Sequence, residues 1–396
     1  MRRAGLLAAL FLAALSLRPQ LVGVGPLLPS IRSGLDVSHA VAGLLGTIPV
    51  LCMGLFAPAA PFLSGRIGSR SALAGALALI GAFGIARAVV PGAALLVLLT
   101  FPVGIGMGLA GAMLPVAVKE RFADRPVFAT GVYTTGISIG AAISAAVAVP
   151  IAHAAGGWRS PLIVFSAFTA GLAALWLWLT RGERPHVRSA VRPLALPFRS
   201  GLAWRLVAAF FFMGFVYYGL NSWLPDAYVE RGWSEGAAGG LLAVLNGVQI
   251  PCGLTAAWLA DRIGSRRAWL AGAALLQLGA LLGLVLLPVG GWAWAVLIGA
   301  AIGPLFPLTM ALPLDIGERP AEVAAVTGMM LGVGYTLSAT SPLLLGAVRD
   351  ATGGFTAVLW VLVAAGVALL ATNALTPARL GAARRSRERP APAESI

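Results

Sequence analysis

The stretch LSLRPQ at residues 15–20 places a charged residue and a proline inside the first apolar run of the chain. From Ala4 to Ile31 this run is otherwise long and apolar enough to cross a bilayer, which takes about 20 residues. Arg18 would then lie near the hydrocarbon midplane, where an arginine costs about 2.5 to 3.5 kcal/mol and normally faces a cavity or a partner. Because its guanidinium stays charged and carries a rigid set of donors, an anion is its natural ligand. We interpret Arg18 as a substrate residue; the alternative is a structural cation held by carbonyl groups that Pro19 frees.

The composition predicts an integral membrane protein. Of 396 residues, 59% are hydrophobic and 11% are charged, and the mean hydropathy is +0.90. The net charge of +14 would suggest nucleic-acid binding in a soluble chain, but the basic residues lie between apolar runs, where membrane topology explains them. We therefore expect a lipid bilayer around the protein and no nucleic-acid partner. Cys52 and Cys252 fall inside apolar runs and indicate neither a disulfide nor a metal site.

Twelve apolar runs are long enough to span the membrane. We place them near residues 4–31, 40–63, 71–90, 94–118, 127–152, 159–180, 204–229, 236–260, 267–289, 292–314, 323–348 and 355–376. The first run continues past Arg18 without a convincing cleavage site, so we interpret it as a retained helix and not as a signal peptide. Most basic residues fall in segments on the side of the two termini, and five arginines, Arg87 among them, fall on the other side. This asymmetry predicts a multi-pass protein of the cytoplasmic (inner) membrane with both termini cytoplasmic.

The two halves of the chain repeat each other. Three landmarks recur at an offset of 196 or 197 residues: IGSR at 67–70 and 263–266, LP at 28–29 and 224–225, and GGW at 156–158 with GGF at 353–355. A duplication of this kind predicts two bundles with a substrate site between them at the midplane. We expect an N-terminal six-helix bundle at residues 1–180, a cytoplasmic linker at 181–203, a C-terminal six-helix bundle at 204–376 and a basic cytoplasmic tail at 377–396.

The loop LADRIGSRR at residues 259–267 resembles the loop signature of the major facilitator superfamily. Several short motifs resemble, more narrowly, its cyanate and 2-nitroimidazole porter branch: LRP at 17–19 with GPLL at 25–28, LPVAVK at 114–119, AVP at 148–150 with GWR at 157–159, and YY at 217–218 with WLP at 223–225. The resemblance implies the major facilitator fold, an all-α membrane protein of twelve transmembrane helices in two six-helix bundles. It also implies transport of a small anionic or polar solute, such as a cyanate-like anion or a nitro-heterocycle.

The same resemblance implies a gate at the cytoplasmic loop, formed by Asp261, Arg262 and Arg266. The alternative for this charge cluster is membrane topology alone. In the first copy of the loop Gly65 stands where the second copy has Asp261, so the gating contact is expected only in the C-terminal half.

Polar and aromatic residues inside the spans are further candidates for the substrate site. The seventh span, which pairs with the first by the repeat, would supply an aromatic wall and one amide, and the eighth would add two polar residues on one helical face. Interfacial anchoring and helix packing are the alternatives for these side chains. The candidates are Tyr217, Tyr218, Asn221 and Trp223, then Asn246 and Gln249, and with weaker support Tyr133 with Thr134 and Tyr335 with Ser338.

No catalytic constellation is present in the sequence. The three histidines lie in loops or at span ends. No span carries a carboxylate near its middle, because Asp226 and Asp315 each fall near the end of their own span. We therefore expect a transporter without cofactor or metal, working as a monomer by alternating access, and not an enzyme. The alternative function is efflux of drugs or organic solutes by proton antiport, which normally uses a buried acidic group.

Overall fold

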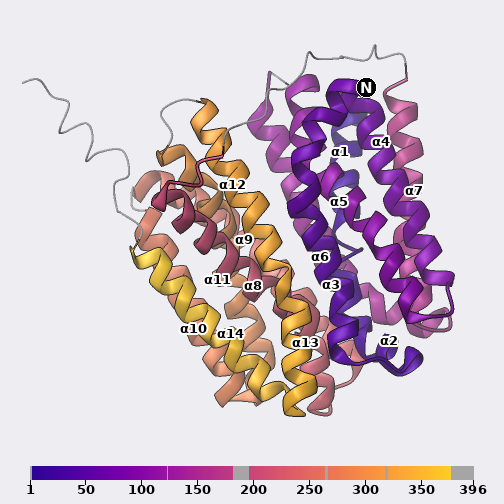
Figure 1. Ribbon diagram of the computed structural model, residues 1–396, viewed down its shortest axis with the longest axis vertical. Helices are drawn as coiled ribbons and strands as arrows, with labels where there is room; N and C mark the ends of the chain where they lie inside the picture. Colours follow the sequence, from indigo (N-terminus) through magenta and orange to yellow (C-terminus); the bar gives the residue numbers. More distant parts are fainter. Residues whose placement is uncertain (1, 123, 182–195, 264–265, 317–319, 376–396) are drawn as a thin grey trace, which may run out of the picture.

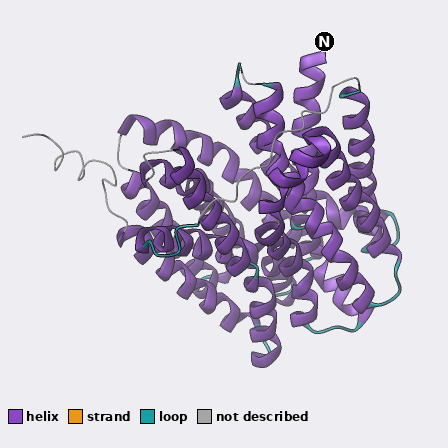
Figure 2. Cartoon of the chain, turned by 45° about the horizontal axis from the view of Figure 1, so that its top comes forward, coloured by secondary structure: helices purple, strands orange, loops and turns teal. Residues whose placement is uncertain are grey.

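The chain folds into helices joined by short connections (Figure 2). The computed structural model describes residues 2–122, 124–181, 196–263, 266–316 and 320–375, and these residues contain no strand. The expected all-α fold class is therefore confirmed.

The first half of the chain forms seven α-helices and two short 3-10 helices. In chain order they are α1 (Arg2–Leu17), η1 (Val22–Leu27), α2 (Leu28–Leu35), α3 (His39–Phe56), η2 (Ala57–Ala59), α4 (Ala60–Val89), α5 (Ala93–Arg121), α6 (Pro126–Ala154) and α7 (Arg159–Leu179). Pro19 ends α1 because a proline has no N–H to donate and clashes with the preceding turn. Ser38 caps α3, its hydroxyl accepting from the backbone N–H of Val41 at 3.3 Å.

The second half repeats this plan, with differences in where its helices are divided. Its elements are α8 (Gly201–Glu230), α9 (Glu235–Ile263), α10 (Arg266–Leu286), η3 (Pro288–Gly290), α11 (Gly291–Ile316), α12 (Pro320–Ser338), α13 (Thr340–Thr352) and α14 (Phe355–Leu375). The helix α8 runs unbroken through Pro225, whereas the corresponding stretch of the first half is divided into α1, η1 and α2. The repeated glycine pairs occupy equivalent places, between α6 and α7 and between α13 and α14, with positive φ at Gly156, Gly157 and Gly353.

The number of membrane-spanning runs agrees approximately with the sequence. Within the described residues, 11 helical runs are long and apolar enough to cross a membrane. One of them, His39–Val89, has 51 residues and contains both spans that we predicted at 40–63 and 71–90. The two spans meet at a break inside α4, at Gly68 in the first copy of the loop motif, where the backbone is not helical: φ is 79° and ψ is 149°. Only glycine adopts that conformation readily.

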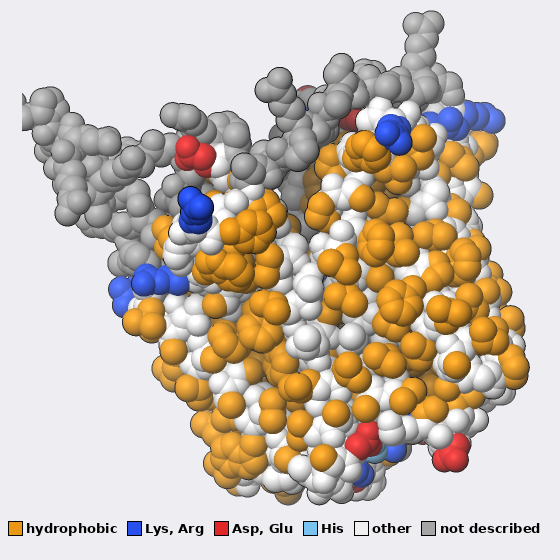
Figure 3. Space-filling model, in the orientation of Figure 1, with side chains coloured by type: hydrophobic (Ala, Val, Ile, Leu, Met, Phe, Trp, Pro, Cys, Tyr) orange, Lys and Arg blue, Asp and Glu red, His pale blue; other side chains and the backbone are white. Residues whose placement is uncertain are grey.

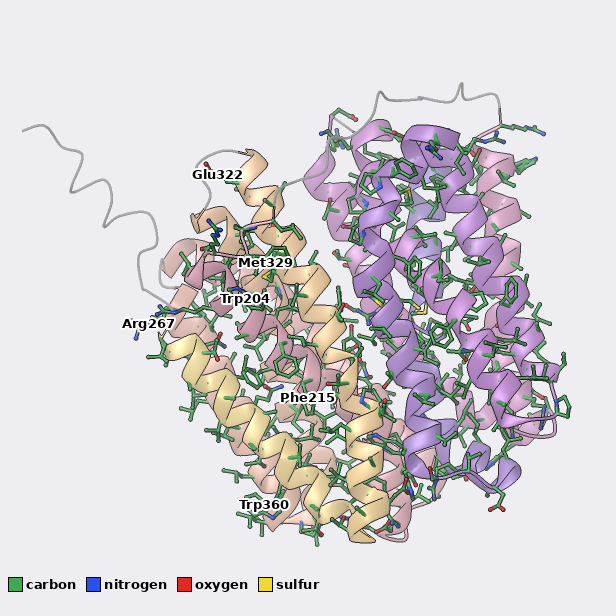
Figure 4. All side chains as sticks on the ribbon, viewed as in Figure 1. Trp204, Phe215, Arg267, Glu322, Met329 and Trp360 are labelled. Atoms are coloured by element: carbon green, nitrogen blue, oxygen red, sulfur yellow. The ribbon has the colours of Figure 1, made fainter. Side chains whose placement is uncertain are left out.

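The helices form two groups that lie side by side (Figure 1). One group holds the helices of the first half and the other holds α8 to α14; α6 packs against α9, and α3 packs against α12 and α13. The groups meet at the end that carries α2 and diverge toward the end that carries the N-terminus. Hydrophobic side chains cover the sides of the molecule, and the visible charges lie toward the helix ends (Figure 3). Trp360, for example, points outward from α14 and is 46% exposed, whereas Phe215 lies inside its group (Figure 4).

Residues 182–195 and 376–396, which contain most of the predicted linker and tail, lie outside the described part of the chain. The exact domain boundaries and the cytoplasmic location of both termini therefore stay predictions.

Candidate functional site

The break after α1 places Arg18 where the two helix groups meet. The carbonyl of Arg18 accepts from the backbone N–H groups of Leu21 and Val22, at 3.0 and 2.8 Å, which turns the chain sharply. The 3-10 helix η1 then packs against α8 and α9 of the other group. Glycine makes this approach possible: a Cβ on Gly25 would lie 2.0 Å from the backbone oxygen of Asn221. The break thus holds the first half against the second beside Arg18.

Three tyrosines of the second half surround the Arg18 side chain. Its Cζ lies 5.7 Å from the ring centroid of Tyr217, a cation–π contact, and Tyr218 and Tyr335 also lie within interaction range of the guanidinium. The rings of Tyr217 and Tyr218 meet edge to face with centroids 5.1 Å apart. Within the described part of the chain, Nη1 of Arg18 is buried and has no hydrogen-bond partner. A buried donor without an acceptor is costly, and an anion or a polar solute would satisfy it.

A chain of amide and hydroxyl groups continues from this aromatic wall. The hydroxyl of Tyr217 donates to Oδ1 of Asn246 at 3.1 Å, and Nε2 of Gln249 donates to the same oxygen at 3.2 Å. Nδ2 of Asn246 donates in turn to Oδ1 of Asn221 at 3.0 Å. The structure therefore brings together Arg18, Tyr217, Asn221, Asn246 and Gln249, which the sequence placed on three different spans.

The remaining candidates have other neighbours. Trp223 is 1% exposed, donates to the carbonyl of Pro342 at 2.8 Å and stacks near His39 and Phe355, in the packing between the groups. Tyr133 packs against the hydrophobic cluster that includes Tyr218, and Tyr335 packs against the same cluster from its place beside Arg18.

Thr134 and Ser338, the two weaker candidates, bond to backbone carbonyl groups. The hydroxyl of Thr134 bonds to carbonyl groups of its own helix, and Ser338 donates to the carbonyl of Phe211. The side chains of Asp261, Arg262 and Arg266 lie outside the described part of the chain. The predicted gate stays a prediction.

Sequence reasoning missed a second buried arginine. We assigned Arg87 to an external segment because it lies near the end of its predicted span, but the structure buries it in α4 with 1% exposure. Its Nη2 donates to the backbone oxygen and to Oε1 of Gln20, at 3.3 and 3.0 Å, and its Nη1 donates to Thr100 at 3.3 Å. Arg87 lies four residues before Pro91, in a run that remains apolar on both sides. This position is the signal that could have indicated its burial.

A cluster of charges joins the two groups at the end of the molecule that carries α2. We call this end the α2 face; it consists of α2, the start of α3, and the ends of α8 and α13. Arg32 pairs with Asp226 at 2.9 Å, and the His39 ring lies 2.7 Å from Asp350 and 3.7 Å from Asp226. Asp226 lies near the end of its span, as the sequence indicated, but it is only 5% exposed. It is buried because α2 and α3 cover this end of α8.

Comparisons with known proteins agree with this architecture. The family model described as Major Facilitator Superfamily matches residues 6–339. The chain is similar to the 2-nitroimidazole transporter of Escherichia coli (strain K12), with 34% identity over 92% of this chain and 92% of the relative. It is similar also to the cyanate transport protein CynX of the same strain, with 31% identity over 88% of this chain and 91% of the relative. Both relatives are named as transporters, which agrees with the expectation that the chain is not an enzyme.

A solved structure supports the fold alone. The crystal structure of a mutant of the nucleoside transporter NupG superposes with a TM-score of 0.77 at 12% identity, covering 94% of this chain and 99% of that chain.

Proposed function

Because this chain belongs to the Major Facilitator Superfamily, we propose that it moves a small anionic or polar solute across the cytoplasmic membrane by alternating access, with Arg18 in the central site. It would act as a monomeric secondary transporter. The relatives named for 2-nitroimidazole and for cyanate cover about nine tenths of this chain, which supports a cyanate-like anion or a nitro-heterocycle as the solute.

One observation carries the proposal: Nη1 of Arg18 is buried and has no hydrogen-bond partner in the described part of the chain. A guanidinium in a membrane interior is retained where it meets a ligand or a partner. The oxygen atoms of a nitro group and both ends of cyanate can accept from its planar fork, and the ring of Tyr217 offers a flat surface beside it.

The packing of the groups supports alternating access. Ion pairs and backbone contacts join them at the α2 face, while the groups diverge toward the other end (Figure 1). This is the arrangement expected of one end state, in which the central site communicates with the side of the N-terminus. The other end state would require the contacts of the α2 face to separate.

The test is binding and tracer uptake of cyanate and of 2-nitroimidazole by the protein in proteoliposomes. Arg18→Lys keeps the charge but loses the planar fork, so it should lose most of the affinity. Arg159→Lys is a matched control, since Arg159 lies at the start of α7 and donates to the carbonyl of Val90. Equal affinities of the Arg18→Lys and wild-type proteins would show that Arg18 is structural.

Proton antiport of an organic solute is the second candidate function. The burial of Asp226 favours it, because such antiporters normally use a buried acidic group. Against it, the charge of Asp226 is already balanced by Arg32 at 2.9 Å. Uphill efflux driven by a pH gradient alone would establish this alternative.

A further inference from the structure

The buried side chain of Arg87 supports the backbone next to Arg18. Arg87 lies in α4, packed between the break of the first span and α5, and its partners are neutral oxygens of Gln20 and Thr100. Gln20 is itself completely buried, and its Nε2 reaches Ser166 of α7 at 3.3 Å. Two helices of the first half, α4 and α7, therefore bond to Gln20, and α5 is joined to it through Arg87.

The break leaves Gln20 in need of a donor. Helix α1 ends at Leu17, and beyond it the backbone N–H of Val24, which would be the α-helical partner of the Gln20 carbonyl, donates to Leu21 at 3.3 Å instead. The carbonyl of Gln20 accepts from Nη2 of Arg87 at 3.3 Å, and its side-chain oxygen accepts from the same nitrogen at 3.0 Å. Bonds to a charged donor in a dry interior are strong and directional. One guanidinium thus fixes both the backbone and the side chain of Gln20.

We propose that Arg87 is a positioning residue: by holding Gln20 it fixes the turn that points the Arg18 guanidinium at the solute. The inference rests on the proposed function, because it concerns the same site. Burying a charge costs free energy. A neutral donor could hold a single carbonyl at a lower cost, if that were the only role of this residue. The arginine instead reaches three oxygens, two on Gln20 and one on Thr100, and so joins the break and α5 to α4.

The experiment measures affinity of the purified full-length protein for cyanate and for 2-nitroimidazole, into the millimolar range, together with the melting temperature without ligand. Arg87→Met removes all donors and keeps an unbranched side chain. Gln20→Met removes the side-chain acceptor of Arg87 and the donor to Ser166 but keeps the backbone acceptor, and it serves if Arg87→Met does not fold. Thr169→Val is the matched control, since Thr169 is a buried polar residue of the same bundle whose hydroxyl donates to the carbonyl of Phe165 in its own helix.

We expect affinity about tenfold weaker in Arg87→Met, a loss of the size of one charged hydrogen bond, and a smaller loss in Gln20→Met. Thr169→Val should bind as the wild type does. The distinguishing measurement is a double-mutant cycle: in an Arg18→Lys background, the Arg87 and Gln20 changes should cost at most a further twofold. A structural defect would lower affinity equally in both backgrounds.

The outcomes separate the inference from the proposed function. Loss of affinity in Arg18→Lys with wild-type affinity in both Arg87→Met and Gln20→Met would overturn the inference alone. Losses that are independent of the residue at 18 would do the same and would make Arg87 a purely structural residue. Wild-type affinity in Arg18→Lys would overturn the proposed site and this inference with it.

Discussion

Asp350 at the end of α13 caps the first turn of α3 at His39, across the boundary between the two helix groups. Its carboxylate accepts from the backbone N–H of His39 at 3.0 Å and from that of Ala40 at 2.8 Å, and the His39 ring adds a contact at 2.7 Å. The first N–H groups of a helix have no partner of their own, and a negative charge there is favoured by the helix dipole. The α2 face is thus held together by a helix cap that one half of the protein supplies to the other.

Removing this cap should favour the state that is open at the α2 face. A helix cap contributes about 1 kcal/mol, so Asp350→Ala should shift the balance of the two states about fivefold. Distances between spin labels at Ser33 and Ala351, in a protein lacking both native cysteines, report the opening. An unchanged distance distribution would contradict a role of the cap in closure.

The pair Arg32–Asp226 should behave as a second lock at the same face. Arg32→Asp alone reverses one charge and leaves two carboxylates close together. It should reduce transport severely, because an unpaired buried charge costs about 3 to 5 kcal/mol. Combining Arg32→Asp with Asp226→Arg should restore much of the loss. The control is the pair Arg349–Glu230, 2.8 Å apart within the second group, whose reversal should leave the two-state balance unchanged. Failure of the double reversal to recover uptake would mean that the two residues do not act through their pairing.

A methyl group at Gly43 should keep the α2 face from closing fully. A Cβ there would lie 2.5 Å from the backbone oxygen of Pro342, so α3 and α13 would have to move apart, at a cost of about 1 to 3 kcal/mol. Gly75→Ala in α4 is the control, because a Cβ at Gly75 meets nothing within 4 Å. The same spin-label distances would decide, and equal distances in the two variants would refute the prediction.

Tyr217→Phe should weaken solute binding without unfolding the protein. The hydroxyl that it removes donates to Asn246 at 3.1 Å, and a lost hydrogen bond of about 1 kcal/mol corresponds to about fivefold in affinity. Tyr228→Phe serves as the control, since the Tyr228 hydroxyl bonds to Pro288 near the end of α8. If both variants bind equally well, the polar chain from Tyr217 to Asn246 is no part of the solute site.

Flux of a permanent anion should follow the membrane potential. An interior-negative potential opposes anion entry by about 2.3 kcal/mol per charge for each 100 mV. With the buried carboxylate of Asp226 already paired to Arg32, we expect tracer flux of a non-protonatable anion to follow an imposed potential or a counter-anion gradient and to respond little to pH. The measurement clamps the potential with potassium and an ionophore while the pH difference is varied. Strong uphill uptake driven by pH alone would reassign Asp226 and His39 as proton carriers.

The sequence predicted those parts of the structure that depend on local pattern. Long apolar runs indicated the spans, and motifs recurring at one offset indicated that the two halves repeat each other. The division of the first span into α1, η1 and α2 was not predicted, because hydropathy alone made residues 4–31 one continuous run.

The parts that the sequence did not predict depend on how helices are rotated and stacked. Arg87 and Asp226 both lie near the ends of apolar runs, where a charge normally reaches water, and only the covering elements show that they are buried. The contact between Tyr217 and Asn246 depends on the rotation of α8 against α9, which periodicity does not specify. The break between the second and third spans depends on one glycine conformation, at Gly68, that no hydropathy pattern records.

The broken first span also bears on how the protein is made. Helix α1 has 16 residues, which rise about 24 Å and fall short of the roughly 30 Å of hydrocarbon. The side chain of Gln20, just after its end, finds its partners in later segments, Arg87 of α4 and Ser166 of α7. A nascent chain that has not yet inserted α7 therefore holds Gln20 without these partners. We expect the first span to reach its final position in the bilayer only after α7 has been synthesised.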